Sequence, residues 1–236
     1  MEGSKKNGQY GISQRTIQKL FNLLQEKEHQ HQQKMMKQDE SISKFEFKIE
    51  ISMLEIYNDE VYDLLDSGLG TTDGTPRSKK SLDIRHGEDQ TVEVPGLIKE
   101  KVDSVASVLA ALDRGNLNRA KATTNLNEHS SRSHMILRVE VTSGVADEQH
   151  KGNLFLVDLA GSERVRKSEV EGKALKEAQH INKSLSALGN VMEALDRKAS
   201  HVPYRDSKVS DISGLKLCVY VVYPFTNCIP FPSFFS

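Results

Sequence analysis

The chain has 236 residues, of which 37% are hydrophobic and 28% are charged, and its formal net charge is −1. This length suits one α/β domain with a proper core, or at most two small ones. The balanced charge excludes a global field that would draw the chain to nucleic acid or to a membrane, so a charged partner must be recognised by a local patch.

The cysteines and the amino terminus bear on the cellular compartment. Cys218 and Cys228 both fall in the last nineteen residues, so no disulfide framework or metal site is readable in the body of the chain. The start of the chain, MEGSKKNGQYG, is polar, unlike a signal peptide. These features fit a reducing cytosol.

The first part of the chain alternates helical and strand patterns. Apolar residues at helical spacing predict a helix over 13–28. We interpret the Gln-, His- and Lys-rich stretch after it as a solvated helix extension or loop, and a metal site at His29 and His31 is the alternative. Residues 45–53 alternate apolar and polar side chains, which predicts a half-buried strand, and NDEVYDLL then predicts a turn or a short helix.

A loop, a pair of strands and a second helix come next. Residues 68–80 are rich in Gly, Thr, Ser and Lys, which predicts an exposed loop. The stretch 81–97 predicts a strand, a turn and a strand. Apolar residues from Val105 to Leu112 give the next helix one buried face, and Gly115 is placed to end that helix.

The second part of the chain continues the alternation. Residues 135–142 again predict a strand, and NLFLVDLAGSE has four consecutive apolar residues before Asp158, which is typical of a central strand covered on both faces. From 171 to 196 the apolar residues step by three or four, which predicts one long amphipathic helix. Helices that alternate with strands predict a layered α/β domain.

The composition changes abruptly near Gly214. The uncharged part of LKLCVYVVYPFTNCIPFPSFFS is just long enough to raise the question of a membrane span. Three prolines would interrupt the backbone hydrogen bonds that a lipid-exposed helix needs. We therefore expect a domain over 1–210 and a divergent apolar tail over 211–236 that is not native to the fold.

Two polar segments carry chemistry. Asp158 ends a buried strand and can reach a magnesium ion, and Gly161 lets a backbone N–H approach a phosphate; an Asp-capped turn is the alternative. The octet NEHSSRSH, residues 127–134, offers hydroxyls that suit magnesium or an attacking water, and Arg132 offers a fork for a carboxylate such as Glu163. A Ser-rich turn with a capping hydroxyl is the alternative for the octet.

Together these segments resemble a known family. NEHSSRSH and LVDLAGSERV resemble the switch I and switch II signatures of the kinesin motor domain, and HINKSLSALGNVMEAL and HVPYRDSK are similar to the helix and loop that follow in that family. GNLNRAKATTNLNEHSSRSH and VEVPGL most resemble the C-terminal-motor, minus-end-directed kinesins. The resemblance implies a P-loop NTPase-like, three-layer α/β/α fold, with Mg²⁺ and ATP as cofactors and ATP hydrolysis coupled to movement along microtubules.

The resemblance also implies a role for single residues. The catalytic set would be Ser130, Ser131, Arg132 and Glu163, with Arg132 paired to Glu163. The nucleotide-binding set would be Asn127, Ser130, Ser131, Asp158 and Gly161, and the magnesium ligands would be Ser131 and Asp158.

The microtubule-facing element would be the long helix with the loops beside it. Its basic side chains form a local set on a nearly neutral chain, which suits the acidic surface of tubulin, and a solvated helix face is the alternative. We expect no nucleic-acid or membrane partner, a location in the cytoplasm on the cytoskeleton, and dimerisation only through segments outside this sequence. The implied microtubule-binding residues are Arg164, Arg166, Lys167, Lys173, Lys176, His201, Tyr204, Arg205 and Lys208.

One kinesin feature does not occur in the 236 residues. The loop G-x-x-x-x-G-K-[ST], which cradles phosphates, has only a partial match at EGKAL, where Lys173 is followed by Ala174. We expect a motor fold truncated at both ends, without the first strands and this loop, and without the last strand and helix. The alternatives are a non-catalytic microtubule-binding fragment or an incomplete gene model of a full-length motor; an unrelated GTPase would need its own cradle, and a serine hydrolase its G-x-S-x-G elbow.

The missing loop leads to a prediction. Because phosphate contacts supply much of the electrostatic stabilisation in such sites, we expect these 236 residues to have no meaningful nucleotide affinity. Calorimetric titration with magnesium and a non-hydrolysable ATP analogue checks this, and micromolar binding would contradict it.

Overall fold

The computed structural model describes residues 3–4, 9–38, 44–66, 80–87, 91–121, 131–146, 148–162, 172–213 and 219–222. Backbone contacts divide the chain into two units. Unit 1 contains Met1–Ser52, Lys99–Asp113 and Arg138–Leu154, and unit 2 contains Met53–Ile98, Arg114–Leu137 and Phe155–Ser236. In the described parts of the chain, no helix is long and apolar enough to cross a membrane.

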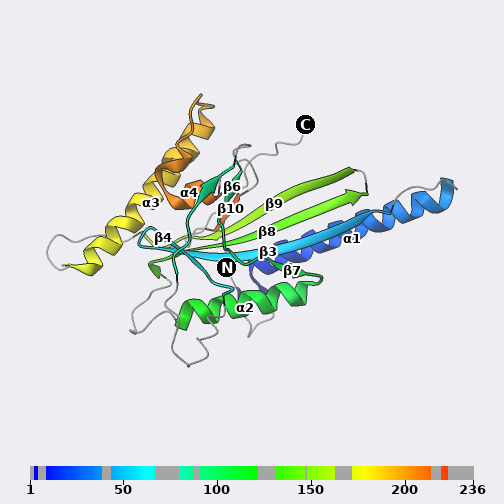
Figure 1. The fold of residues 1–236 in the computed structure, drawn as a ribbon, viewed down its shortest axis with the longest axis horizontal. Coiled ribbons are helices and arrows are strands. Elements are labelled where there is room, and N and C mark those ends of the chain that lie inside the picture. The colour runs from blue at the N-terminus through cyan, green and yellow to red at the C-terminus, as the bar shows by residue number, and fades with distance from the viewer. Residues whose placement is uncertain are drawn as a thin grey trace. The chain divides into compact units, whose positions relative to one another are not determined.

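The principal sheet has six strands (Figure 1). Its order is β10-β9-β8-β3-β4, and β7 pairs with β3 away from this path. Three of these strands are long and run through both units: β3 (Glu46–Tyr57), β8 (His134–Val145) and β9 (Glu148–Asp158). The short ones are β4 (Glu60–Asp63), β7 (Glu100–Val102) and β10 (Val219–Val222).

Unit 1 contains the amino-terminal helix, the first part of β3, the last part of β8 and the first part of β9. A two-stranded pair of β1 (Gly3–Ser4) and β2 (Gln9–Tyr10) precedes α1 (Ile12–Gln38). The α1 helix buries Ile17, Phe21 and Leu24, and α2 (Val105–Lys121) begins in this unit. β7 pairs antiparallel with β3, with Ile49 opposite Val102.

The Gln- and His-rich stretch continues α1, so the interpretation of a helix extension is confirmed. The side chain of Gln33 lies 2.8 Å from the ring of His29, four residues away, and His31 lies beside the ring of Phe45. Within the described residues, no group of three or more His, Cys, Asp or Glu side chains could hold a metal ion. The metal alternative therefore has no support there.

Unit 2 contains a hydrophobic core cluster and the helices of the carboxyl half. Its elements are β4, the second half of α2, the pair β5 (Arg85–His86) and β6 (Val92–Glu93), α3 (Lys173–Asp196), η3 (Tyr204–Asp206), α4 (Lys208–Ser213) and β10. The predicted long helix is confirmed as α3. NDEVYDLL does not form a helix, because Asn58 and Asp59 make a two-residue hairpin turn with φ of 50° and 61°, and β4 follows.

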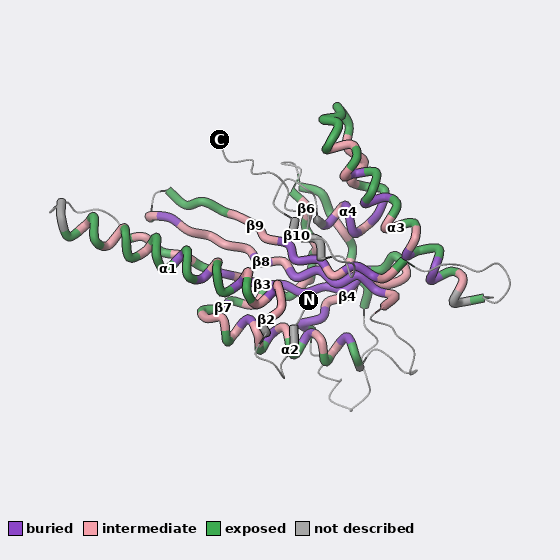
Figure 2. The backbone as a smooth tube through the Cα atoms, turned by 180° about the vertical axis from the view of Figure 1, so that it is seen from behind, coloured by how far each residue is buried: buried purple, intermediate pink, exposed green. Residues whose placement is uncertain are grey.

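The two faces of the unit 2 sheet serve different helices. Leu54, Ile56 and Ile136 belong to one buried cluster with Leu188 of α3 and Val209 of α4. The alternate residues point the other way: Met53 faces Gly115 of α2, and Glu55 faces Arg119 of the same helix. Figure 2 shows the burial of this stretch in purple. Unit 2 is thus a sheet with helices on both faces.

The apolar tail contributes one strand to this sheet. β10 runs parallel to β9, with Val219 opposite Phe155 and Val222 opposite Asp158. This pairing gives β9 a neighbour on each side, as expected for a strand whose Leu156 and Val157 are fully buried. Ile212 of α4 is buried in the core cluster, so the start of this tail also belongs to the fold. The prediction that 211–236 lies outside the fold stays a prediction for 214–218 and 223–236, which are outside the described residues.

Gly115 was predicted to end the second helix, and this is wrong. The α2 helix continues to Lys121, and Gly115 is buried in its middle. A Cβ atom there would lie 2.2 Å from Sδ of Met53, which is fully buried. The glycine allows close approach of α2 to β3, because a Cβ would collide with the buried side chain of Met53.

A pair of glycine substitutions tests this packing. Gly115→Ala should lower the free energy of unfolding by about 1–3 kcal/mol, because overpacking outweighs the gain in helix propensity. Gly189→Ala is the matched control, since a Cβ at this α3 position meets no atom within 4 Å. It should raise stability by up to about 1 kcal/mol. Urea denaturation measures both changes, and equal effects of the two substitutions would contradict the packing argument.

Candidate functional site

A buried guanidinium joins four elements of unit 2 on the α2 face of the sheet. Arg119 of α2 is 8% exposed and lies 3.3 Å from Glu55 of β3, which is 1% exposed. Its Nη2 donates to the carbonyl oxygen of Ser133 at 2.9 Å and to the Ser133 hydroxyl at 3.0 Å. Its Nη1 lies 3.6 Å from the carboxylate of Asp158, at the end of β9. A buried charge is stable only with such partners.

The imidazole of His134 lies on the opposite face of the sheet, in the first residue of β8. Its Nδ1 accepts a hydrogen bond from the backbone N–H of Ala160 at 3.2 Å, and its Nε2 lies 2.8 Å from the hydroxyl of Ser184 in α3. Burial, with a smaller contribution from the positive charge of Arg119, lowers the pKa of His134 to about 4. The ring is therefore neutral at physiological pH.

A third contact connects the octet to α3 through Glu177, which is buried in that helix. Arg132 donates through Nη1 to Glu177 at 3.0 Å, and the Tyr57 hydroxyl at the end of β3 donates to the other oxygen of the same carboxylate. Burial, followed by this hydrogen bond, raises the pKa of Tyr57 to about 12. The carboxylate thus holds a cation and a phenol from two different segments.

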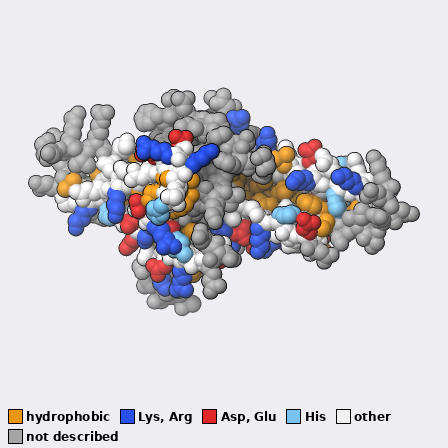
Figure 3. Space-filling model, turned by 90° about the horizontal axis from the view of Figure 1, so that it is seen from above, with side chains coloured by type: hydrophobic (Ala, Val, Ile, Leu, Met, Phe, Trp, Pro, Cys, Tyr) orange, Lys and Arg blue, Asp and Glu red, His pale blue; other side chains and the backbone are white. Residues whose placement is uncertain are grey.

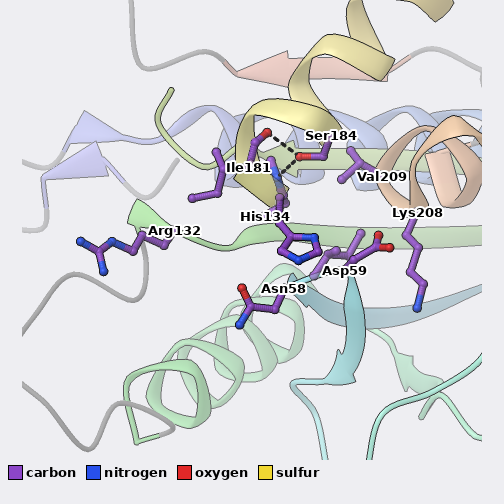
Figure 4. Close-up of a pocket in the computed structure, with 10 residues that line it drawn as sticks. Asn58, Asp59, Arg132, His134, Ile181, Ser184, Lys208 and Val209 are labelled. Atoms are coloured by element: carbon purple, nitrogen blue, oxygen red, sulfur yellow. Dashed lines mark hydrogen bonds between the residues drawn. The ribbon is translucent and has the colours of Figure 1, made fainter. Parts of the chain in front are cut away.

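A small pocket lies beside Arg132, His134 and Ser184 (Figure 4). It measures about 20 Å³, which is room for one water molecule. Figure 4 shows His134 in its middle, with Arg132 on one side and Lys208 and Asp59 on the other. The lining residues are Ile56, Asn58, Asp59, Arg132, His134, His180, Ile181, Ser184, Lys208 and Val209.

The structure brings together several of the predicted site residues. Ser131, Arg132, Asp158 and Gly161 all lie in unit 2, and the Gly161 N–H donates to the carbonyl oxygen of Ser131 at 3.0 Å. The two polar segments are therefore in direct contact, as their predicted common role requires. The predicted residues outside the described ones are Asn127, Ser130, Glu163, Arg164, Arg166 and Lys167.

The predicted pairing of Arg132 with Glu163 stays a prediction, since Glu163 lies outside the described residues. In the structure, the carboxylate that Arg132 contacts is that of Glu177. Sequence reasoning missed Glu177, Tyr57 and Arg119. For Arg119 a signal existed: it follows Gly115 by one helical turn and so lies on the same buried face of α2.

The described residues do not by themselves fit a magnesium nucleotide. Ser131 and Asp158 have the oxygen ligands that Mg²⁺ prefers. Asp158, however, pairs with Arg119, and the N–H of Gly161 is used by Ser131, so both groups are engaged. The sequence also contains no G-x-x-x-x-G-K-[ST] loop to hold the phosphates.

The family model of the kinesin motor domain matches residues 1–215, which include both polar segments and α3. This chain belongs to the kinesin motor domain family. It is 42% identical over 212 residues to kinesin-like protein KIN-14S of Arabidopsis thaliana, covering 89% of this chain and 25% of that protein. It is 44% identical over 216 residues to kinesin heavy chain of Strongylocentrotus purpuratus, covering 90% of this chain and 19% of that protein.

Solved kinesin structures agree with this assignment. The chain is similar to that of a fast kinesin with a TM-score of 0.70 at 36% identity, covering 94% of this chain and 58% of the other. It is similar to the C-terminal motor and motor homology domain of Kar3Vik1 with a TM-score of 0.65 at 35% identity, covering 87% of this chain and 48% of the other. The predicted likeness to C-terminal-motor kinesins is confirmed by several KIN-14 relatives at 40–42% identity.

This kinesin chain spans a quarter or less of the length of the curated relatives it matches. It also covers only part of a motor domain, since it spans 58% of the fast kinesin chain. The kinesin motor fold, an α/β fold, is thereby established for the part of the motor domain that the chain covers.

The buried imidazole leads to a pH prediction for this kinesin chain. The pKa of His134 is about 4 when folded and about 6.5 when unfolded, so the unfolded state binds more protons between these values. The free energy of unfolding should therefore be highest above pH 6.5 and fall by roughly 3 kcal/mol as the pH drops to about 4. Urea denaturation across this range measures the change. In His134→Asn, this share of the acid sensitivity should disappear; unchanged acid sensitivity would contradict the assignment.

Proposed function

We propose that this chain is the switch-containing and tubulin-binding part of a kinesin that couples ATP hydrolysis to movement along microtubules in the cytoplasm. The magnesium ion and ATP would be held with the help of a phosphate-binding loop that is not among these 236 residues. Ser131, Asp158 and Gly161 would then respond to the nucleotide, and α3, η3 and α4 would contact the microtubule. Family membership and the contact between the two polar segments support this proposal.

The observation that carries the proposal is the grouping of basic side chains around α3. The α3 helix contacts both η3 and α4, and these two elements contact each other. Lys176, His201 and Arg205 are exposed, and Tyr204 and Lys208 are half-buried beside them. The described side chains of this set therefore belong to adjoining elements of one unit and to the segment between α3 and η3. The backbone of Lys173 begins α3.

This basic set is local and not part of a general positive charge. Lysine and arginine side chains are interspersed with carboxylates on the face shown in Figure 3, and the whole chain has a net charge of −1. An acidic protein surface such as that of tubulin would attract this set over roughly a Debye length, about 8 Å at cellular salt. Such patches act mainly on the rate of association and on its salt dependence.

A second candidate function is that of a non-catalytic microtubule-binding fragment. It uses the same surface, and it is favoured by the ion pair that engages Asp158 and by the absence of a phosphate loop from the sequence. Nucleotide binding distinguishes the two candidates. The motor function requires that a longer chain containing the phosphate-binding loop binds ATP, whereas a non-catalytic fragment does not require it.

Charge reversal in α3 and η3, compared with charge reversal in α1, tests the proposed surface. The double variant Lys176→Glu and Arg205→Glu should weaken co-sedimentation with microtubules at low salt by roughly tenfold, since each exposed contact is worth up to about 1 kcal/mol. The matched control is Lys27→Glu with Lys34→Glu, two exposed lysines of α1, which should bind as the parent does. A parent chain that stays in the supernatant at low salt, or equal loss in both variants, would refute the proposed surface.

A further inference from the structure

The side chain of His134 contacts two segments at once, and both belong to the proposed machinery. On one side it accepts from the N–H of Ala160, two residues after Asp158. On the other side it reaches Ser184, in the middle of α3. His134 is 3% exposed and Ala160 is 3% exposed, so the hydrogen bond between them is buried, whereas the contact with Ser184 is half-buried and borders the small pocket. None of the three residues was predicted as a site residue.

The hydrogen bonds determine which nitrogen of the neutral His134 ring carries the proton. Because Nδ1 accepts from Ala160, the proton of the neutral ring must be on Nε2, which then donates to the Ser184 hydroxyl. That hydroxyl in turn donates to the carbonyl oxygen of Ile181 at 2.8 Å, one turn earlier in α3. Each donor in this series has one acceptor, and only one tautomer satisfies all of them.

The connection between Ala160 and Ser184 is also rigid, because a single ring spans it. The imidazole is a rigid planar ring, so the positions of Nδ1 and Nε2 are fixed relative to each other, unlike the ends of a flexible side chain. A shift of α3 relative to Ala160 must either carry the ring along or leave a buried donor unpaired, which is costly. Figure 4 shows the ring between the strand that carries it and the Ser184 side chain of α3.

We propose that His134 is a positioning residue that couples α3 to the segment after β9, so that displacement of α3 is transmitted to the backbone amides of Ala160 and Gly161. The coupling within the chain does not depend on the identity of any partner. Its consequence does rest on the proposed function: tubulin bound at α3 would act on the segment whose Gly161 N–H a nucleotide would meet. Ser184 is the α3 end of this connection.

The two ends of the ring can be removed separately. His134→Asn places its side-chain oxygen near the position of Nδ1 and keeps the acceptor for Ala160, but it is too short to reach Ser184. Ser184→Ala removes the α3 end and leaves the histidine in place. Ser184→Thr keeps the hydroxyl and is the conservative control.

The first measurement is amide hydrogen exchange of the full chain without microtubules. Ser184→Ala should speed exchange in the segment containing Ala160 and Gly161 by about fivefold, although Ser184 is in another element. In the His134→Asn background the same substitution should have no further effect, and Ser184→Thr should exchange as the parent does. Exchange at Ile49–Ile51 of β3, in unit 1, is the internal control for folding and should be unchanged. No change with Ser184→Ala, or an equal change in both backgrounds, would overturn the coupling.

The second measurement is the ¹⁵N spectrum of the His134 ring at neutral pH. A purely space-filling histidine has no required tautomer, whereas the proposed connection requires an unprotonated Nδ1 and a protonated Nε2. A ring protonated on Nδ1, or on both nitrogens, would overturn the proposal.

The third measurement adds microtubules. Their binding should change exchange at Ala160 and Gly161 in the parent, and this response should be lost in His134→Asn while co-sedimentation stays within twofold of the parent. If the chain does not sediment at all, the proposed function fails, and the first two measurements still decide the coupling. If it sediments and the response at Ala160 survives in His134→Asn, the transmission through His134 is wrong.

Discussion

The buried guanidinium of Arg119 is the constraint on which the rest of unit 2 depends. A charge that is 8% exposed must keep its partners, and these are Glu55 of β3, Ser133 immediately before β8, and Asp158 of β9. The ends of β3, β8 and β9 are therefore held in one register with α2. This register decides where the polar segments lie, because Ser133 belongs to the octet and Asp158 ends the predicted central strand.

The alternation of the strands then divides the octet between the two faces of the sheet. Ser133 points to α2 and meets Arg119, whereas His134, the next residue, points to α3 and meets Ser184. Arg132 reaches Glu177, which is also on α3. A slip of one residue would exchange these two environments, placing the imidazole against Arg119. The density of polar side chains in NEHSSRSH is thus partly explained by structure: several of them hold neighbouring elements together.

Family membership gives this arrangement a context. The kinesin motor domain model matches residues 1–215, a range that includes both polar segments and α3. The octet was expected to serve magnesium and water through its hydroxyls, whereas the described structure engages Ser133, Arg132 and His134 in contacts between elements. These two uses are compatible. Contacts that hold the octet against α3 would also transmit a displacement of α3 to the octet.

The sequence by itself determined the elements with a strong period and the motifs with a fixed order. The long helix at 171–196, the strand beginning at 45 and the buried strand before Asp158 all have patterns set by local burial, and α3, β3 and β9 follow them. Only the tertiary structure decided the partners: Arg119 meets Glu55 across 64 residues, and Arg132 meets Glu177 across 45. It also decided that Gly115 lies inside α2, because a glycine that allows close approach looks, in one dimension, like one that ends a helix. Local patterns report which face is buried, but not what lies against it, and the chemistry of this site depends on what lies against it.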